Sequence, residues 1–291
     1  MSKEKNKLKP IDAPIYHYWS ALYMSFYSRL LYIDVGKRWK GLGIFYFLFA
    51  IAIFSIPFAL RISFSLDQSF KEQITDPLSK IPVFYIQNGE VSLNKPMPYF
   101  VKNDKGQVVV IIDTADKIND FTANYPYLAI LINKNKISLK VPSLTVFNMP
   151  QPKQSEGAPI VQFFDKGTNG VFDGKKYAES SSIQNLKYFS ELLIYPMVVA
   201  MFFSMFLVIF LVLGFLGQVF SSVFFSFNVT FAQSCRLLAV AATPMLFLLF
   251  ILLIINFLFP GSGFILSALL VIYYSFSLHS LRAESRKVAR L

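Results

Sequence analysis

The sequence has little of what disulfide-stabilised domains and most enzymes depend on. Its 291 residues include one cysteine, Cys235, and two histidines, His17 and His279. A single cysteine excludes an internal disulfide, and neither histidine lies in a metal-binding or hydrolytic motif. The sequence also lacks a G-x-S-x-G elbow, a phosphate-binding loop and a dinucleotide fingerprint. We therefore expect a protein that needs no cofactor or metal and is not an enzyme.

Charge is missing from three long stretches, residues 41–60, 192–235 and 237–281. About 20 apolar helical residues cross a hydrocarbon core of roughly 30 Å. These stretches predict a bundle of four transmembrane helices, at 41–60, 192–213, 236–258 and 263–281. The first stretch is too long, and lies too far into the chain, for a cleaved signal peptide. No acidic residue lies inside any predicted span, which argues against proton-coupled transport and intramembrane aspartyl proteolysis.

The net charge of +11 lies mainly in two short segments. Basic residues dominate in 1–40 and in the tail 282–291, whereas they nearly balance acidic residues in 61–191. Short basic flanks stay in the cytoplasm, and long loops cross the membrane largely regardless of charge. We expect both termini in the cytoplasm and 61–191 outside it. Basic segments beside spans favour lipid head groups as the partner rather than nucleic acid.

Aromatic residues are concentrated at 15–39, "IYHYWSALYMSFYSRLLYIDVGKRW". Aromatic rings accumulate at the membrane–water boundary. This segment is therefore either an interfacial helix or an ordinary helix that packs on the bundle.

The polar region 61–191 reads as a small β-rich domain inserted between the first two spans. Asn88-Gly89 separates two short apolar runs and predicts a tight hairpin. "VVVIID" at 108–113 predicts a central strand that is apolar on both faces. The segment 150–182 is rich in Gly, Ser, Pro and Lys and predicts a loop that returns to the membrane. The predicted fold class is thus membrane α+β.

Two motifs in this domain resemble binding sites. Asp113 and Thr114 follow the central strand and form a candidate binding pair, although such residues more often begin a turn or cap a helix. "DKGTNGVFDGKK" at 165–176 resembles a calcium loop, but Lys176 stands where a bidentate Glu is required. An ordinary turn-rich loop is therefore the better interpretation.

Methionines and prolines occur at positions of the predicted spans where they affect packing or helix geometry. Met197, Met201 and Met205 share one helix face, where packing is a commoner role than Cu(I) binding. Pro196 is predicted to begin the second span, and Pro244 to kink the third.

Residues 214–235 predict a separate amphipathic helix lying at the inner interface. Within it, Gly214 and Gly217 would let helices approach closely. Asn228 is the predicted N-cap of the third span.

Four segments carry a resemblance to a known family: "FYSRLLYIDVGKRWKGLGIFYFL" (26–48), "IPVFYIQNGEVSL" (81–93), "VVIIDT" (109–114) and "CRLLAVAATPMLFLL" (235–249). Their order and spacing resemble the bacterial membrane family of unknown function 1189, over about residues 20–282. Some members are named maltodextrin-utilisation membrane proteins. The resemblance implies a bacterial cytoplasmic membrane with the β-rich domain outside. It implies neither a catalytic residue nor a reaction.

Three functions are compatible with these patterns. The first is a non-enzymatic membrane protein whose outward β-rich domain binds a ligand or a membrane or periplasmic protein partner. The second is an accessory subunit of a transporter or channel. The third is an enzyme that modifies lipids with residues scattered in sequence. The absence of a catalytic motif favours the first two, and the sequence does not fix the oligomeric state.

Overall fold

The computed structural model describes residues 13–122, 124–140 and 159–288. These residues form two compact units. The first, here called the helical unit, comprises Met1–Leu60 and Tyr195–Leu291, and the second, the β-unit, comprises Arg61–Ile194. Each unit is described by itself below.

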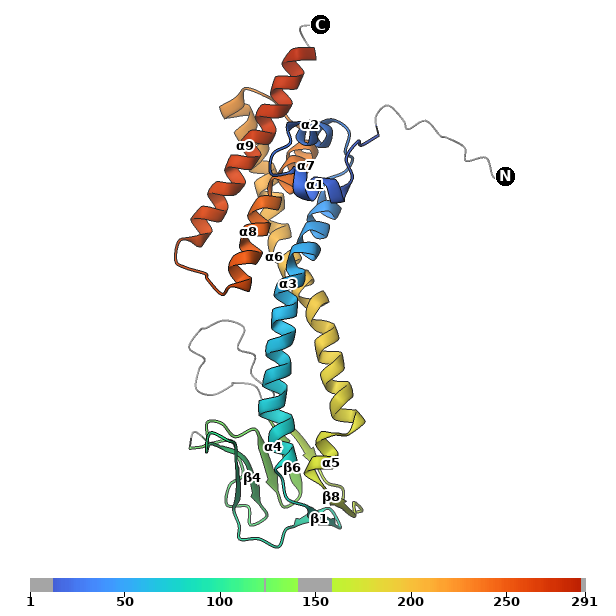
Figure 1. Ribbon diagram of the computed structural model, residues 1–291, viewed down its shortest axis with the longest axis vertical. Helices are drawn as coiled ribbons and strands as arrows, with labels where there is room; N and C mark the ends of the chain where they lie inside the picture. The colour runs from blue at the N-terminus through green and yellow to red at the C-terminus, as the bar shows by residue number, and fades with distance from the viewer. Residues whose placement is uncertain (1–12, 123, 141–158, 289–291) are drawn as a thin grey trace, which may run out of the picture. The chain divides into compact units, whose positions relative to one another are not determined.

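The helical unit is built from α-helices (Figure 1). Its short helices are α1 (Tyr18–Met24) and α2 (Arg29–Lys37), and its longer ones are α7 (Phe231–Ala241), α8 (Thr243–Ile254) and α9 (Ser262–Val288). Helices α3 (Ile44–Phe70) and α6 (Ser181–Phe225) have residues in both units. Helix α2 packs against α7 and α9, so the aromatic N-terminal segment is a pair of helices, of which α2 packs on the bundle.

Four helical stretches are long and apolar enough to cross a membrane: Ile44–Ser79, Gly174–Phe225, Phe231–Ile254 and Ser262–Lys287. The prediction of four such helices is confirmed. Their ends differ from the prediction, because each of the first two helices continues into polar sequence that hydropathy does not recognise as helix.

The predicted separate helix at 214–235 is wrong. Residues 214–225 belong to α6, which is 45 residues long, and the chain turns only at Ser226, where φ is +46°. The helix continues through Gly214 and Gly217, which are poor helix formers, because both glycines lie against residues of the neighbouring helices. Pro196 accordingly lies inside α6 rather than at its start.

Thr230, not Asn228, caps the helix that follows. The Thr230 hydroxyl accepts from the N–H of Gln233, and the Gln233 side chain accepts in return from the N–H of Thr230. This reciprocal capping box fixes the start of α7. Helix α7 ends at Ala241 and α8 begins at Thr243, with Pro244 as the second residue of α8.

Among the residues that the structure describes, the β-unit contains eight strands and several short helices. The strands are β1 (Phe84–Gln87), β2 (Glu90–Ser92), β3 (Tyr99–Lys102), β4 (Val108–Asp113), β5 (Ile130–Asn133), β6 (Lys136–Leu139), β7 (Ile160–Phe163) and β8 (Gly170–Phe172). The short helices are the π-helix η1 (Lys71–Thr75), α4 (Asp76–Ser79) and α5 (Gly174–Ala178). The chain is therefore mixed α+β.

The strands form two sheets, with orders β2-β1-β8 and β3-β4-β5-β6-β7. Strands β4 and β5 are parallel, and the other pairs are antiparallel. The hairpin expected at Asn88-Gly89 joins β1 to β2, with positive φ at both residues. Gly89 also has no room for a side chain, because a Cβ there would lie 2.6 Å from the carbonyl oxygen of Asp165.

The core of the β-unit covers both faces of the five-stranded sheet. Val110, Ile112, Ile130 and Ile132 pack with apolar residues of α3, η1 and α4 on one face. Ile111, Leu128 and Leu131 pack with partly buried residues of the segment that joins β4 to β5. Strand β4 is buried along nearly its whole length, as its uninterrupted apolar sequence predicts.

The loop expected at 150–182 is wrong where the structure describes it. Residues 150–158 lie outside the described ranges, but β7, β8 and α5 occupy most of 160–178, and α6 begins at Ser181. Strand β7 pairs with the edge of β6, and strand β8 pairs with the edge of β1. Composition alone does not reveal these pairings, because the partner strands are distant in sequence or separated by a loop.

Candidate functional site

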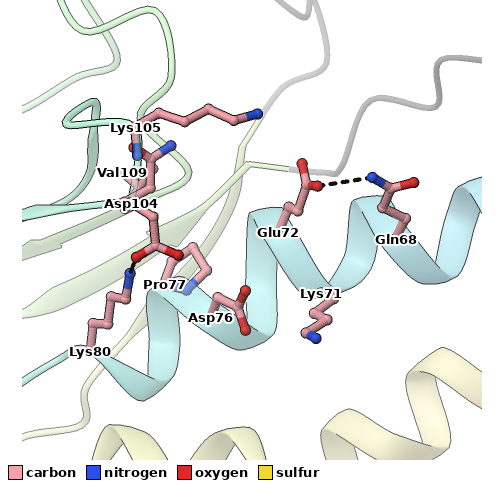
Figure 2. A pocket seen from close by; sticks show the side chains of 10 residues that line it. Gln68, Lys71, Glu72, Asp76, Pro77, Lys80, Asp104, Lys105 and Val109 are labelled. Carbon is pink, nitrogen blue, oxygen red and sulfur yellow. Dashed lines mark hydrogen bonds and ion pairs between the residues drawn. The ribbon is translucent and has the colours of Figure 1, made fainter.

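A half-open hollow of about 370 Å³ lies within the β-unit. One wall is helical and carries Gln68, Lys71, Glu72, Asp76, Pro77 and Lys80. The other is the turn between β3 and β4, with Asn103, Asp104, Lys105 and nearby Val109 (Figure 2). Polar and charged side chains from distant parts of the sequence meet here.

Local geometry explains why these side chains converge. The helical wall passes through η1, and a π-helical turn is a feature that is frequent at functional sites. In the opposite turn, the Asn103 side-chain oxygen accepts from the N–H groups of Lys105 and Gln107 at 3.0 and 2.9 Å. Gly106 completes the turn with a φ of +75°. The turn is therefore fixed by its own hydrogen bonds.

Both signs of charge line the hollow. Lys80 Nζ donates to Asp104 Oδ1 at 2.7 Å, and Gln68 Nε2 donates to Glu72 Oε1 at 3.0 Å. Lys105 extends away from the Lys80–Asp104 pair (Figure 2). Such a hollow suits a polar or zwitterionic ligand. Among the described residues, no group of three or more His, Cys, Asp or Glu is placed to hold a metal ion.

The Lys80–Asp104 pair predicts a measurable titration. The hydrogen bond and charge of Lys80 lower the pKa of the Asp104 carboxyl. A lowered folded-state pKa adds stability above the ordinary aspartate pKa, and that stability is lost as pH falls through the lowered value. We expect Lys80→Met to raise the Asp104 pKa toward its ordinary value, measured by NMR on ¹³C-aspartate protein. Lys105→Met is the control and should leave the titration unchanged. Equal titration in wild type and both variants would contradict the pairing.

Asp113 lies outside this hollow. It is fully buried at the end of β4, and its carboxylate accepts from the N–H groups of Ala115 and Ile118 at 3.1 and 2.7 Å. Its neighbour Thr114 is only partly buried. The Asp113 carboxylate thus holds the turn after β4 by accepting from its backbone.

Asn133 is the residue that sequence reasoning missed here. It pairs with Asp113 across the parallel strands, and its Nδ2 donates to the Ile118 carbonyl at 2.8 Å. The signal available was an asparagine that ends a strand-like apolar run, "LAILIN".

The methionine face is open rather than packed. Met197, Met201 and Met205 are exposed by 66%, 57% and 47%, so the described residues of this chain do not cover them, and their predicted role in packing stays a prediction.

Gly214 and Gly217 lie where α6 closely approaches other helices of the helical unit. A Cβ at Gly214 would clash with Cys235 Sγ, and one at Gly217 would lie 2.6 Å from the Tyr274 hydroxyl. The Ser234 hydroxyl donates to the Gly214 carbonyl at 2.7 Å. The two glycines thus bring α6 against α7 and α9.

Pro244 lies beside a buried hydrogen bond. The hydroxyls of Thr243 and Tyr46 lie 2.7 Å apart and join α8 to α3 within the helical unit. The threonine before the proline therefore bonds a tyrosine of another helix.

Strand β7 is an exposed apolar strand at the edge of the five-stranded sheet, and the sequence did not predict it. All four of its residues are exposed, including Ile160, Val161 and Phe163 at 60%, 42% and 65%. It ends the order of the five-stranded sheet, and no strand among the described residues pairs with its other edge.

The described residues combine four helices that are long and apolar enough to cross a membrane with a unit of two sheets, which is a mixed α+β fold. The chain belongs to the family described as Protein of unknown function (DUF1189), whose model matches residues 19–278. No curated protein and no solved structure matches the chain. The expected family is confirmed. Its description names no activity, and the match does not show the maltodextrin name of some members for this chain.

Proposed function

We propose that this is a non-enzymatic, multi-pass protein of a bacterial cytoplasmic membrane, whose β-unit binds a protein partner along strand β7. The basic residues before Ile44 and after Leu281 support cytoplasmic termini under the positive-inside rule. Because the β-unit follows the first span in the chain, cytoplasmic termini would put it outside. The helices would hold this unit at the membrane surface beside a membrane or periplasmic partner.

The exposure of β7 carries the proposal. An edge strand normally avoids apolar side chains on both faces, because its free N–H and C=O groups are a template for another strand. Strand β7 instead exposes Ile160, Val161 and Phe163. An extended peptide that adds to such an edge gains main-chain hydrogen bonds and apolar contacts together.

The register identifies which groups are available. Phe164 N–H donates to the Asn135 carbonyl at 2.9 Å, toward β6. Neighbouring residues of an antiparallel strand alternate in the direction of their hydrogen bonds. Val161 and Phe163 therefore direct their N–H groups away from β6, toward the open edge.

We expect Val161→Pro to abolish partner binding and to preserve the fold, because proline removes an N–H that β6 does not use. Val161→Thr, which keeps both the N–H and the β-branched shape, is the matched control. Benzoylphenylalanine placed at Phe163 in living cells should give a discrete cross-linked product. That product should disappear with Val161→Pro and persist with Val161→Thr.

A photo-cross-linker at Tyr127, which is 58% exposed in the same unit, should not give this product. A product that survives Val161→Pro, or the absence of any product at Phe163, would contradict binding at β7. Mass spectrometry of the product identifies the partner. A permease as partner would make this chain the accessory subunit of a transporter.

A further inference from the structure

The open edge of β7 carries no charged side chain, which distinguishes it from the other end of the same sheet. Among the described residues, β3 and β7 are the two end strands of the five-stranded sheet. Strand β3 carries the exposed Lys102, whereas Gln162 is the one polar side chain of β7. Natural proteins commonly place charge, especially lysine, on an edge strand to keep it from pairing with other chains. Strand β7 lacks this protection against pairing with its own copy.

The main-chain groups that β7 directs to the open edge belong to Val161 and Phe163, one on each side of Gln162. The opposite side of β6 agrees with this direction. There, Lys140 N–H donates to the Ala129 carbonyl beside β5 at 2.8 Å, so the neighbouring positions of β6 bond β7 instead. The edge therefore offers two N–H groups and two C=O groups, placed symmetrically about Gln162.

A second copy of β7 satisfies these groups when it lies antiparallel, with Gln162 opposite Gln162 of the copy. Val161 then lies opposite Phe163 of the copy, and Phe163 opposite Val161 of the copy. Both residues direct their main-chain groups to this edge, so each of these pairs exchanges both of its N–H···O=C bonds. The two glutamines form the non-hydrogen-bonded pair between them, at the symmetry axis.

Other positions of the axis lose some of these bonds. An axis closer to the start of β7 sets Pro159 opposite Val161 or Phe163, and proline has no N–H to donate. An axis closer to the end of β7 sets Asp165 opposite one of them. Asp165 lies beyond the strand, and its carbonyl already accepts from Thr168 N–H at 2.8 Å. The register is therefore fixed by the chain itself.

The side chains are complementary in the same register. Val161 and Phe163 of the copy lie directly opposite on one face of the sheet, and an aromatic side chain opposite a β-branched one stabilises a pair of strands. At the axis, an amide lies opposite an identical amide, and each can both donate and accept. A lysine or a glutamate in place of Gln162 would instead face its own charge.

We propose that the partner of β7 is a second copy of this chain, and that two copies join their five-stranded sheets through antiparallel β7 strands about a symmetry axis at Gln162. This inference rests on the proposed function, because it names the partner for the same edge. Pairing of an edge with itself closes after two copies, so it produces a dimer and no filament.

Cysteine replacement tests the register in full-length Cys235→Ala protein in its membrane. Across a non-hydrogen-bonded pair the Cα atoms lie about 4.5 Å apart, within the range of roughly 4.4–6.8 Å that a disulfide spans. Gln162→Cys should therefore give a disulfide-linked dimer with copper phenanthroline. The control is Ile160→Cys, on the same face of β7 and 60% exposed. It would lie roughly 14 Å from its copy, four residues along the strands, and should give no such dimer.

Kept in reductant, both cysteine variants should run as monomers and react with maleimide, because their side chains lie on an open face of the sheet. A disulfide-linked dimer of Ile160→Cys but not of Gln162→Cys would overturn pairing about Gln162. Equal cross-linking of the two variants would indicate random collision and would also overturn it, as would the absence of a dimer from both.

Charge reversal tests whether the partner is identical. Gln162→Lys or Gln162→Glu alone sets like charges opposite each other at the axis. Each should weaken co-purification of two differently tagged copies roughly twofold to fivefold, the usual effect of one cross-strand pair. One copy of each variant sets opposite charges together and should restore co-purification at least to the wild-type level. Unchanged self-association of both variants, or a mixed pair that does not recover, would overturn the proposal.

The photo-cross-linker at Phe163 separates this inference from the proposed function. A product made of two copies of the chain supports both. A product that contains a different protein, and that disappears with Val161→Pro, overturns self-pairing and leaves β7 as a binding edge. The absence of any product overturns both.

Discussion

Gly217→Ala is expected to destabilise the helical unit by about 1–3 kcal/mol, the usual cost of overpacking a close contact. The added methyl would lie 2.6 Å from the Tyr274 hydroxyl and 2.7 Å from Ser234 Oγ. Those two hydroxyls lie 2.7 Å apart, so neither can move without weakening a buried hydrogen bond. The clash outweighs the gain of up to roughly 1 kcal/mol that alanine brings to a helix.

The matched control for this prediction is Gly263→Ala, the same change in α9. A Cβ at Gly263 meets nothing within 4 Å. The melting temperature in detergent should fall for Gly217→Ala and stay level or rise slightly for Gly263→Ala. If both variants melt together with the wild type, α6 does not approach α7 and α9 as closely as described.

Asp34→Ala should have a larger effect, about 2–4 kcal/mol, because it removes a buried carboxylate that accepts several hydrogen bonds, although its ion-pair partner Arg38 is 37% exposed. The carboxylate accepts from the backbone at Ile15 and Tyr16 and from Arg38. Without it, two backbone N–H groups and a guanidinium lose their acceptor. The segment before α1 should then detach from α2 and become sensitive to protease.

Asp34→Asn keeps the shape of the side chain and tests the same contacts. It should lower the free energy of unfolding less than Asp34→Ala does, because the amide oxygen of asparagine still accepts a hydrogen bond. Glu284→Ala is the control. That carboxylate lies 3.9 Å from Lys37 Nζ and is partly exposed, so its loss should cost about 0–1 kcal/mol. Equal melting temperatures for Asp34→Ala and Glu284→Ala would contradict a structural role for Asp34.

The sequence predicted the features that depend on local chemistry. Runs without charge identify the four apolar helices, and Asn88-Gly89 identifies the β1–β2 hairpin because both residues tolerate positive φ. The family was also recognisable, from the order of four short segments.

Features that depend on distant partners were not predictable. Residues 214–225 read as an amphipathic helix by composition, yet they extend α6 because Gly214 and Gly217 pack against residues of α7 and α9. The sequence of β7 and β8 is typical of a loop. These segments become strands because β7 pairs with β6 and β8 pairs with β1.

The candidate sites were hidden for the same reason. The charged hollow joins Lys80 to a turn 24 residues later. The segment before α1 depends on Asp34, which accepts from backbone groups 18 and 19 residues earlier. In both, the side chains that matter are ordinary in sequence, and only the fold brings them together.

The side of the membrane on which the β-unit lies is the most direct test of this account. In a Cys235→Ala background, Gln162→Cys marks the exposed strand β7 and Arg286→Cys marks the basic end of α9. A membrane-impermeant maleimide applied to intact cells should label the protein carrying Gln162→Cys and should label that carrying Arg286→Cys only after the membrane is opened. The reverse pattern would place the β-unit in the cytoplasm and contradict recognition of an external partner.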